Sequence, residues 1–293
     1  MKRKKKKKGI LSTFIVILIA LAGLSLLLYP TVSNYWNSRH ATRTIMRYSE
    51  QVAKMSEEEI NTMWQAAEAY NERLSKKPGA SMLSDAEQAE YRTLLNIGDS
   101  GVMGYVEIKS LDVFLPIYHG TDDTVLQIAA GHVDWTSLPI GGESTHSVIS
   151  GHRGLPSAKL FTDLDELVIG DTFTLNVLGS TMTYEVDQIL TVLPYEMDAL
   201  TVTKGMDYCT LMTCTPYGIN THRLLVRGHR VPNEQDPTPT RVVSEAVQIS
   251  PILVGSIVAV VPLLLILIYV MQRRNERKAG KARKADQAHS QEK

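Results

Sequence analysis

Two long apolar runs, one near each end of the chain, most limit what this sequence of 293 residues can fold into. The first, Ile10 to Tyr29, holds 20 residues without a charge, and the second spans Ile252 to Val270. A helix needs about 20 such residues to cross a bilayer. Pro262, inside the second run, is better tolerated in a membrane helix than in a soluble one. We therefore predict transmembrane helices at residues 10–29 and 251–271, with about 220 residues between them.

The first run has an alternative interpretation, a signal peptide that is removed after export. Its apolar core, however, is longer than the roughly 7–15 residues usual in such peptides. No small-x-small cleavage site follows at Tyr29-Pro30-Thr31 either. We therefore predict a retained anchor.

Basic residues flank both runs and predict their orientation. Residues 2–8 read KRKKKKK, and residues 273–293 carry eight Lys or Arg against three acidic residues. Positively charged flanks stay on the cytoplasmic side. The sequence therefore predicts a two-pass protein of the cell membrane, with cytoplasmic tails at residues 1–9 and 272–293 and an extracellular central part.

The formal net charge of zero hides the charge of that central part. Without the two tails, 16 basic residues remain against 28 acidic ones, a net charge of about −12. Binding to nucleic acid needs clustered Lys and Arg side chains on phosphates. We expect no nucleic-acid partner.

The segment at residues 30–97 is predicted to be a helical neck between the membrane and the main domain. Ser56 and Glu59 form a capping box, and Lys76 to Gly79 supplies a stop signal. Between them, apolar residues recur every three or four positions, at Ile60, Met63, Trp64, Ala67, Tyr70 and Leu74. This spacing is typical of one helix face. A second, shorter helix is predicted from Asp85 to Leu95.

From Val102 onward the pattern changes to short apolar stretches broken by turn residues. Seven or more stretches within about 130 residues indicate a closed barrel or a sandwich. Gly179-Ser180 is a two-residue hairpin signal, and Thr162 to Leu167 favours one helical turn. We place the main domain at residues 98–231 and a Pro-rich linker at residues 232–250.

The chain has two cysteines, Cys209 and Cys214. On one strand, residues five apart point to opposite faces, so these two cannot bond to each other. Cys209 is most simply a small buried hydrophobe. Cys214 ends an apolar stretch just before a turn, and is the unpaired thiol that needs an explanation.

Cysteine chemistry on an acyl carbon needs a thiolate, a proton carrier and a donor for the oxyanion. Cys214, His152 and Arg223 are candidates for these roles. The histidines that compete with His152 are His119, His132, His146, His222 and His229. His119 precedes a glycine in a setting similar to that of His152, and spacing alone does not separate the two. Arg223 is equally consistent with a surface strand residue, as Arg227 is. Each residue by itself therefore leaves the catalytic and the structural interpretation open.

A metal site is the other common use of Cys with His. The sequence contains no C-x₂-C, H-x₃-H or HEXXH spacing. No Gly-rich phosphate loop occurs either. We therefore predict neither a metal nor another cofactor.

Two segments resemble a known family. TLMTCTPYGINTHRLLVRGHR is similar to the active-site motif of the sortases, and HSVISGHRGLPSAKLFTDLDELVIGDTFT is similar to their histidine segment. With GVMGYVEI, LPIYHGT and the two apolar runs, the chain resembles class C, the pilin-polymerising sortases of Gram-positive bacteria. The resemblance covers residues 98–231 almost continuously.

This resemblance implies a fold and residue roles. The fold is mainly β, a closed eight-stranded barrel. Cys214 is the nucleophile, His152 rather than His119 is the acid/base, and Arg223 binds substrate and stabilises the oxyanion. The enzyme is a thiol transpeptidase that cleaves an LPXTG-like sorting signal between Thr and Gly and passes the acyl group to a pilin lysine.

Two other functions stay open from the sequence. One is a transpeptidase that anchors surface proteins to a cell-wall peptide amine. The other is an inactive, membrane-tethered module that only holds sorting signals, which the intact trio of Cys214, His152 and Arg223 argues against. The partners implied are pilin or surface proteins with LPXTG-like signals, the acceptor lysine and the membrane.

One departure concerns the lid. Class C sortases often carry an Asp-Pro-aromatic motif that covers the cysteine, and the corresponding LSKKPGASMLSDAEQAEYRTLL lacks it. Either a different segment around Ala80 to Asp85 covers the thiol, with Met82 near it, or the site is open.

Overall fold

The computed structural model describes residues 3–77 and 83–233, with single positions at 268, 272 and 280. Side chains are described from residue 18 onward. The chain divides into two units, residues 1–31 with 238–293, and residues 32–237. The predicted linker beyond residue 233 and the second apolar run, apart from Ile268, lie outside the described residues. The two-pass topology and the predicted domain limits therefore stay predictions.

Helix α1 (Arg3–Lys54) contains the first apolar run. Within it, residues Leu18–Lys54 are long and apolar enough to cross a membrane, with a mean hydropathy of 1.4 in the most apolar stretch. A helix of this kind near the N-terminus is suited to a membrane anchor.

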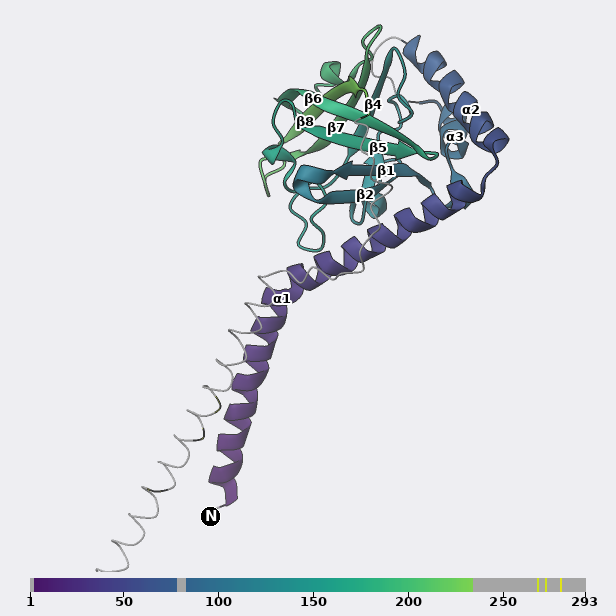
Figure 1. The fold of residues 1–293 in the computed structure, drawn as a ribbon. Coiled ribbons are helices and arrows are strands. Elements are labelled where there is room, and N and C mark those ends of the chain that lie inside the picture. The colour runs from purple at the N-terminus through teal and green to yellow at the C-terminus, as the bar shows by residue number, and fades with distance from the viewer. Residues whose placement is uncertain (1–2, 78–82, 234–267, 269–271, 273–279, 281–293) are drawn as a thin grey trace, which may run out of the picture. The chain divides into compact units, whose positions relative to one another are not determined.

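Eight strands form a closed barrel in the order β1-β2-β3-β4-β7-β8-β6-β5 (Figure 1). Strand β5 pairs with β1 and closes the ring. Two neighbouring pairs, β2 with β3 and β4 with β7, are parallel, and the others are antiparallel. The predicted eight-stranded barrel is confirmed. The strands are β1 (Val102–Ile108), β2 (Val113–His119), β3 (Ala130–His132), β4 (Thr145–Ser150), β5 (Thr172–Val177), β6 (Ser180–Val192), β7 (Asp207–Thr215) and β8 (His222–Val231).

Short helices precede and connect the strands. Both α2 and α3 begin with complete capping boxes, at Ser56 with Glu59 and at Ser84 with Glu87, so the first box is confirmed and the second was not predicted. The predicted helical turn near residue 164 is the 3₁₀ helix η3. The helices are α2 (Glu57–Ser75), α3 (Asp85–Thr93), α4 (Asp123–Leu126), η1 (Ile97–Asp99), η2 (Lys109–Leu111), η3 (Leu164–Glu166) and η4 (Asp198–Leu200).

The helices of the predicted neck pack on the barrel rather than only leading to it. Ala67 and Tyr70 of α2 and Tyr91 of α3 are buried in the same apolar core as the barrel interior. The Asn71 side chain donates to the Leu138 carbonyl over 3.1 Å and accepts from the Leu138 N–H over 2.7 Å. Figure 1 shows α2 and α3 together on one side of the barrel. These contacts make both helices part of the same packed unit.

The second half of α1 also packs on the barrel, which the sequence analysis did not predict. Ala41, Ile45, Tyr48 and Val52 are buried, at spacings of four, three and four. The Tyr48 hydroxyl donates to the Met103 carbonyl over 2.9 Å and accepts from the Leu178 N–H over 2.8 Å. Because Tyr48 loses water on both sides, burial raises the pKa of its phenol.

The hairpin between β5 and β6 turns one residue earlier than predicted. Val177 pairs with Ser180, so the two turn residues are Leu178 and Gly179 rather than Gly179 and Ser180. Both have positive φ, 49° and 82°, as a type I′ turn requires. Leu178 tolerates this backbone because its side chain is buried and its N–H bonds to Tyr48. A tertiary contact therefore decides the turn.

Candidate active site

The paired strands β7 and β8 place Cys214 directly opposite Arg223. Side chains alternate along β7, so Cys209 and Leu211 point into the core while Cys214 points away from it. Cys209 is completely buried, and burial raises the pKa of its thiol. Cys214 is half-buried, and both sulfurs are free. The predicted contrast between the two cysteines is confirmed.

The parallel pairing of β4 with β7 brings His152 to the same end of the barrel. Ser150 pairs with Met212, and the Gly151 N–H donates to the Met212 carbonyl over 3.0 Å. His152 lies two residues after Ser150, and Cys214 lies two residues after Met212. In parallel strands, equal steps along both chains keep residues level. Cys214 of β7, Arg223 of β8 and His152, two residues after β4, therefore lie at the same end of three neighbouring strands.

A glycine is required just before His152. A Cβ at Gly151 would lie 2.6 Å from the Phe161 ring. The Phe161 N–H in turn donates to the His152 carbonyl over 3.1 Å, and the Thr213 hydroxyl donates to the Gly151 carbonyl over 2.7 Å. The backbone at His152 is therefore fixed on both sides, while the imidazole has no hydrogen-bond partner among the described residues.

The Arg223 guanidinium has donors to spare. Its Nη1 donates to the carbonyls of His222 and Asn220 over 3.1 and 3.4 Å, and no carboxylate of the described residues pairs with it. Arg227, on the same face, forms a two-point ion pair with Asp187 at 2.9 and 3.0 Å and stacks over Tyr208. A guanidinium has five N–H donors, so several donors of Arg223 have no acceptor among the described residues.

Three of the competing histidines, His119, His132 and His146, form hydrogen bonds within the fold. Both ring nitrogens of His119 face backbone carbonyls, those of Leu94 at 2.7 Å and Gly101 at 3.0 Å. Burial lowers the pKa of His132 to about 3 and that of His146 to about 4. Neutral, enclosed imidazoles of this kind are poor proton carriers near neutral pH.

Arg153 was missed by the sequence analysis, although its position directly after His152 was a signal. Its guanidinium pairs with Asp165, approaches the Thr215 hydroxyl at 3.5 Å and lies 5.9 Å from the centre of the Tyr217 ring. Its side chain is only 12 % exposed. Arg153 therefore connects the segment after β4 to the residues that follow Cys214.

An apolar floor extends from Cys214 along the outer face of the barrel. Val148 of β4 and Leu225 of β8 cluster there with Val133 and Leu200, and Met212 packs against them. Leu200 belongs to η4 in the connection between β6 and β7. The segments that follow β6 and β7 expose the large apolar side chains of Tyr195, Met197, Tyr217 and Ile219.

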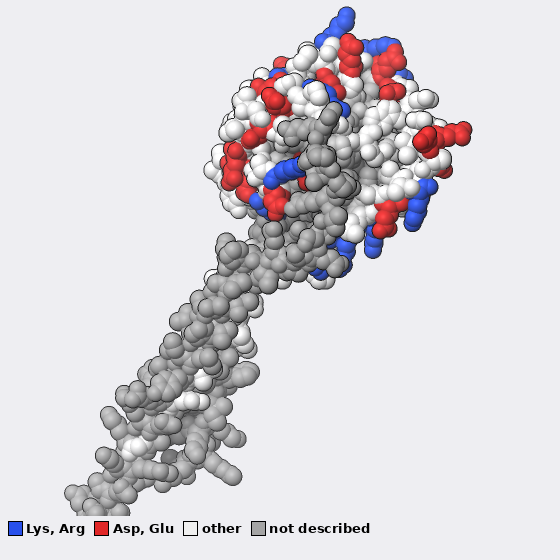
Figure 2. All heavy atoms as spheres, in the orientation of Figure 1, with Lys and Arg blue, Asp and Glu red and all other residues white. Residues whose placement is uncertain are grey.

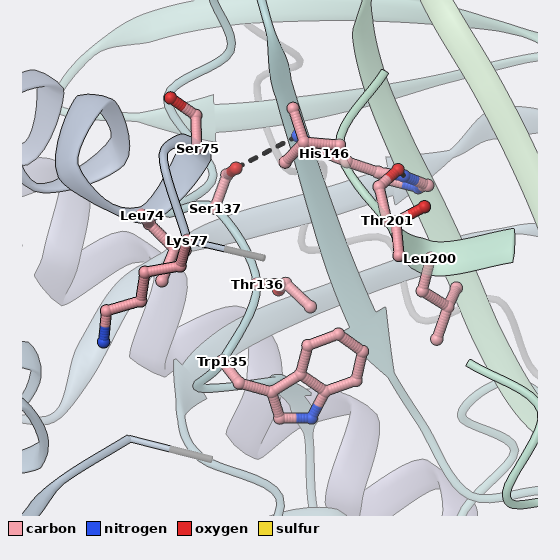
Figure 3. A pocket seen from close by; sticks show the side chains of 10 residues that line it. Leu74, Ser75, Lys77, Trp135, Thr136, Ser137, His146, Leu200 and Thr201 are labelled. Carbon is pink, nitrogen blue, oxygen red and sulfur yellow. Dashed lines mark hydrogen bonds between the residues drawn. The ribbon is translucent and has the colours of Figure 1, made fainter. Parts of the chain in front are cut away.

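A small cavity of about 90 Å³ lies at the other end of this face. Its lining comes from the end of α2, the segment after β3, β4 and the residues around η4, and does not include Cys214, His152 or Arg223 (Figure 3). At the edge of the cavity, the backbone N–H of His146 donates to the Ser137 hydroxyl oxygen over 3.1 Å. The lining residues are Leu74, Ser75, Lys77, Trp135, Thr136, Ser137, His146, Leu200, Thr201 and Val202.

Charge and metal ligands give little further definition. On the face shown in Figure 2, acidic and basic side chains are interspersed and form no single basic patch. The described residues contain no group of three His, Cys, Asp or Glu side chains that could hold a metal ion.

The lid question stays open because Ala80 to Met82 lie outside the described residues. Leu83 packs against the apolar core, and Ser84 caps α3. Both alternatives for the lid therefore stay predictions.

Residues 106–231 match the family described as Sortase domain. Among curated proteins, the chain is 24 % identical over 221 residues to Sortase A of Streptococcus agalactiae serotype III (strain NEM316), covering 73 % of this chain and 84 % of that protein. Among solved structures, sortase C1 of Streptococcus agalactiae is 49 % identical, with a TM-score of 0.64 over 66 % of this chain and 100 % of that one. Sortase C of Streptococcus pneumoniae, whose structure is described in relation to pilin substrate specificity, is 45 % identical, with a TM-score of 0.59 over 65 % and 97 %.

Proposed function

Since the chain belongs to the sortase family of cysteine transpeptidases, with solved class C sortases among its similar structures, we propose that it polymerises pilin subunits. In this proposal it cleaves an LPXTG-like sorting signal between Thr and Gly. It then joins the threonine carboxyl group to a lysine amine of another subunit. The barrel at residues 98–231 works outside the cell, held by membrane helices on both sides.

The observation that carries the proposal is the meeting of Cys214, His152 and Arg223 at one barrel rim. Cys214 and Arg223 are partners in the β7–β8 register. The β4–β7 register ends at Ser150 and Met212, which lie two residues before His152 and Cys214. A cation beside a half-exposed sulfur favours the thiolate. Unlike the buried His132 and His146, His152 is only partly buried, and its ring has no hydrogen-bond partner among the described residues.

The residues then divide the reaction as follows. The Cys214 thiolate attacks the threonine carbonyl, and Arg223 donates to the oxygen as negative charge develops on it. Protonated His152 gives its proton to the glycine nitrogen as the C–N bond breaks, which leaves a thioester on Cys214. A lysine amine next attacks the thioester and loses a proton to His152. The new amide forms, the thiolate is regenerated and no other energy source is needed.

The test is the covalent pilin ladder in cells and the adduct in the purified protein. Cys214→Ala is expected to abolish both the ladder and the mass increase produced by an LPXTG peptide. Cys209→Ala is the matched control, because it removes the chain's other thiol from the opposite face of the same strand. A ladder that persists in Cys214→Ala contradicts the proposal. An adduct without a ladder would instead favour attachment of surface proteins to a cell-wall amine.

A further inference from the structure

Two asparagines of α1 hold a loop of the catalytic domain. The Asn34 side-chain oxygen accepts a hydrogen bond from the Lys159 N–H over 2.7 Å. The Asn37 side-chain nitrogen donates to the Ser157 carbonyl over 2.8 Å. The two asparagines are three residues apart and so lie on one face of the helix. That face continues directly into the buried stripe of Ala41 and its successors.

The loop that they hold begins at His152. It returns on itself, because the Phe161 N–H bonds to the His152 carbonyl over 3.1 Å and Leu155 bridges to Ala158. The Gly154 N–H donates to the Thr162 hydroxyl over 3.2 Å, which adds a second tie between the two sides of the loop. A loop bonded in this way moves as one piece. The contacts of α1 with residues 157–159 therefore also restrain the other end of the loop, where His152 lies.

The barrel packs against the side chains of the same loop, whereas α1 bonds to its backbone at Ser157 and Lys159. Ala158 and Leu160 are buried, and the Lys159 ammonium pairs with Asp163 and donates to the Leu111 carbonyl over 3.1 Å. Lys159 itself is exposed as a residue. The asparagines thus complete the support of a segment that would otherwise present its backbone to water on that side.

We propose that Asn34 and Asn37 are positioning residues for His152, so that proton delivery to the leaving amine depends on the helix that carries the apolar run. This inference rests on the role of His152 given under the proposed function. The asparagines touch neither substrate nor thiol. They act by keeping the imidazole at the height of Cys214, where small displacements are costly to the rate.

The experiment uses the full-length protein in detergent and measures the rate at which Cys214 is acylated in a single turnover. One substrate is an LPXTG peptide, whose amine must be protonated to leave. The other is an LPXT p-nitrophenyl ester, whose phenolate leaves without a proton. The double variant Asn34→Ala/Asn37→Ala should slow the amide reaction about three- to tenfold, the factor that one or two net hydrogen bonds represent. The ester reaction should stay within about twofold.

Single variants test the direction of each hydrogen bond. Asn34→Asp keeps an oxygen for the Lys159 N–H and should react as the native protein does. Asn37→Asp replaces a donor by an acceptor facing the Ser157 carbonyl and should be as slow as the double alanine variant. Ser38→Ala, on the exposed side of the same turn, is the control and should have no effect.

The outcomes separate this inference from the proposed function. Equal slowing of both substrates in the alanine variant indicates general damage to the site and overturns the inference, as does an unchanged amide rate. His152→Ala in parallel should strongly slow the amide reaction and spare the ester. An undiminished amide rate in His152→Ala would contradict the proposed function itself, whatever the asparagine variants show.

Discussion

Strand β7 carries two cysteines, one on each face, and their surroundings differ in burial and in charge. Cys209 faces the barrel interior, where it is completely buried and burial raises the pKa of its thiol. Cys214 faces outward at the end of the strand, half-exposed and opposite an arginine that has no carboxylate partner among the described residues. The difference teaches that the reactivity of a thiol here is decided by which face and which end of the strand it occupies.

The most direct way to break this comparison is alkylation. Iodoacetamide should modify Cys214 at least about a thousandfold faster than Cys209, because Cys209 becomes accessible only when the core opens, at a cost of several kcal/mol. The measurement is the rate of mass increase in Cys214→Ala and in Cys209→Ala at pH 7. Similar rates in the two variants would mean that the inner face is not closed.

Two arginines of β8 sharpen the comparison along the outer face. Arg223→Lys should reduce transpeptidation about a hundredfold, the usual loss when one oxyanion donor is removed, because a single ammonium replaces the fork of donors. Thermal stability should change little. Arg227→Lys should show the reverse pattern, since Arg227 is already engaged by Asp187 and Tyr208. The measurements are kcat/KM for an LPXTG peptide and Tm for each variant.

The opposite end of the same face should respond to pH through His146. Its ring contacts the Thr201 carbonyl and the Thr210 hydroxyl. Burial lowers the pKa of this ring to about 4, while the charge of Arg227 lowers the pKa and that of Asp187 raises it. The unfolded state binds the proton first, so this contribution to stability is fully present above about pH 6.5 and is lost as pH falls towards 4. Between pH 7 and pH 5 the loss should be about 2 kcal/mol.

Denaturant unfolding of the native protein and of His146→Gln at both pH values isolates this effect. The glutamine variant should be less stable at pH 7 but should lose less stability on acidification. A pH dependence identical in the two proteins would show that His146 does not carry it.

The smallest expected effect compares two glycines that flank the site. Gly151→Ala places a Cβ 2.6 Å from the Phe161 ring and should cost about 1–3 kcal/mol of stability, with a slower reaction because His152 follows. Gly218→Ala meets no atom within 4 Å and is opposed only by its positive φ of 74°. It should cost about 1 kcal/mol. Chemical denaturation ranks the two, and a larger loss at Gly218 would contradict the assignment of tight packing to Gly151.

Local patterns were sufficient to predict much of this molecule. Alternation along one strand separated Cys209 from Cys214, and the capping box at Ser56 predicted the start of α2. The prediction that was wrong concerned a short turn whose position depends on a residue far away in the sequence. The β5–β6 turn lies one residue earlier than its glycine suggests, because Tyr48, 130 residues away, bonds to Leu178.

The site was predictable only in part for the same reason. The choice of His152 over His119 came from the resemblance to a family and not from spacing, since the parallel register of β4 and β7 cannot be deduced from either segment alone. Asn34 and Asn37 gave no signal at all. Their partners Lys159 and Ser157 lie more than a hundred residues away. The role of an asparagine on a helix cannot be inferred from the sequence when its hydrogen-bond partner is unknown.

The parallel pairing of β4 with β7 also bears on when the enzyme becomes active. Parallel neighbours cannot be joined by a hairpin, and here the chain forms β5 and β6 before it returns to lie beside β4. Pairings between distant segments are generally late steps in folding. The thiol of Cys214 and the segment that follows β4 are therefore brought to the same end of the barrel only once the ring of strands has closed.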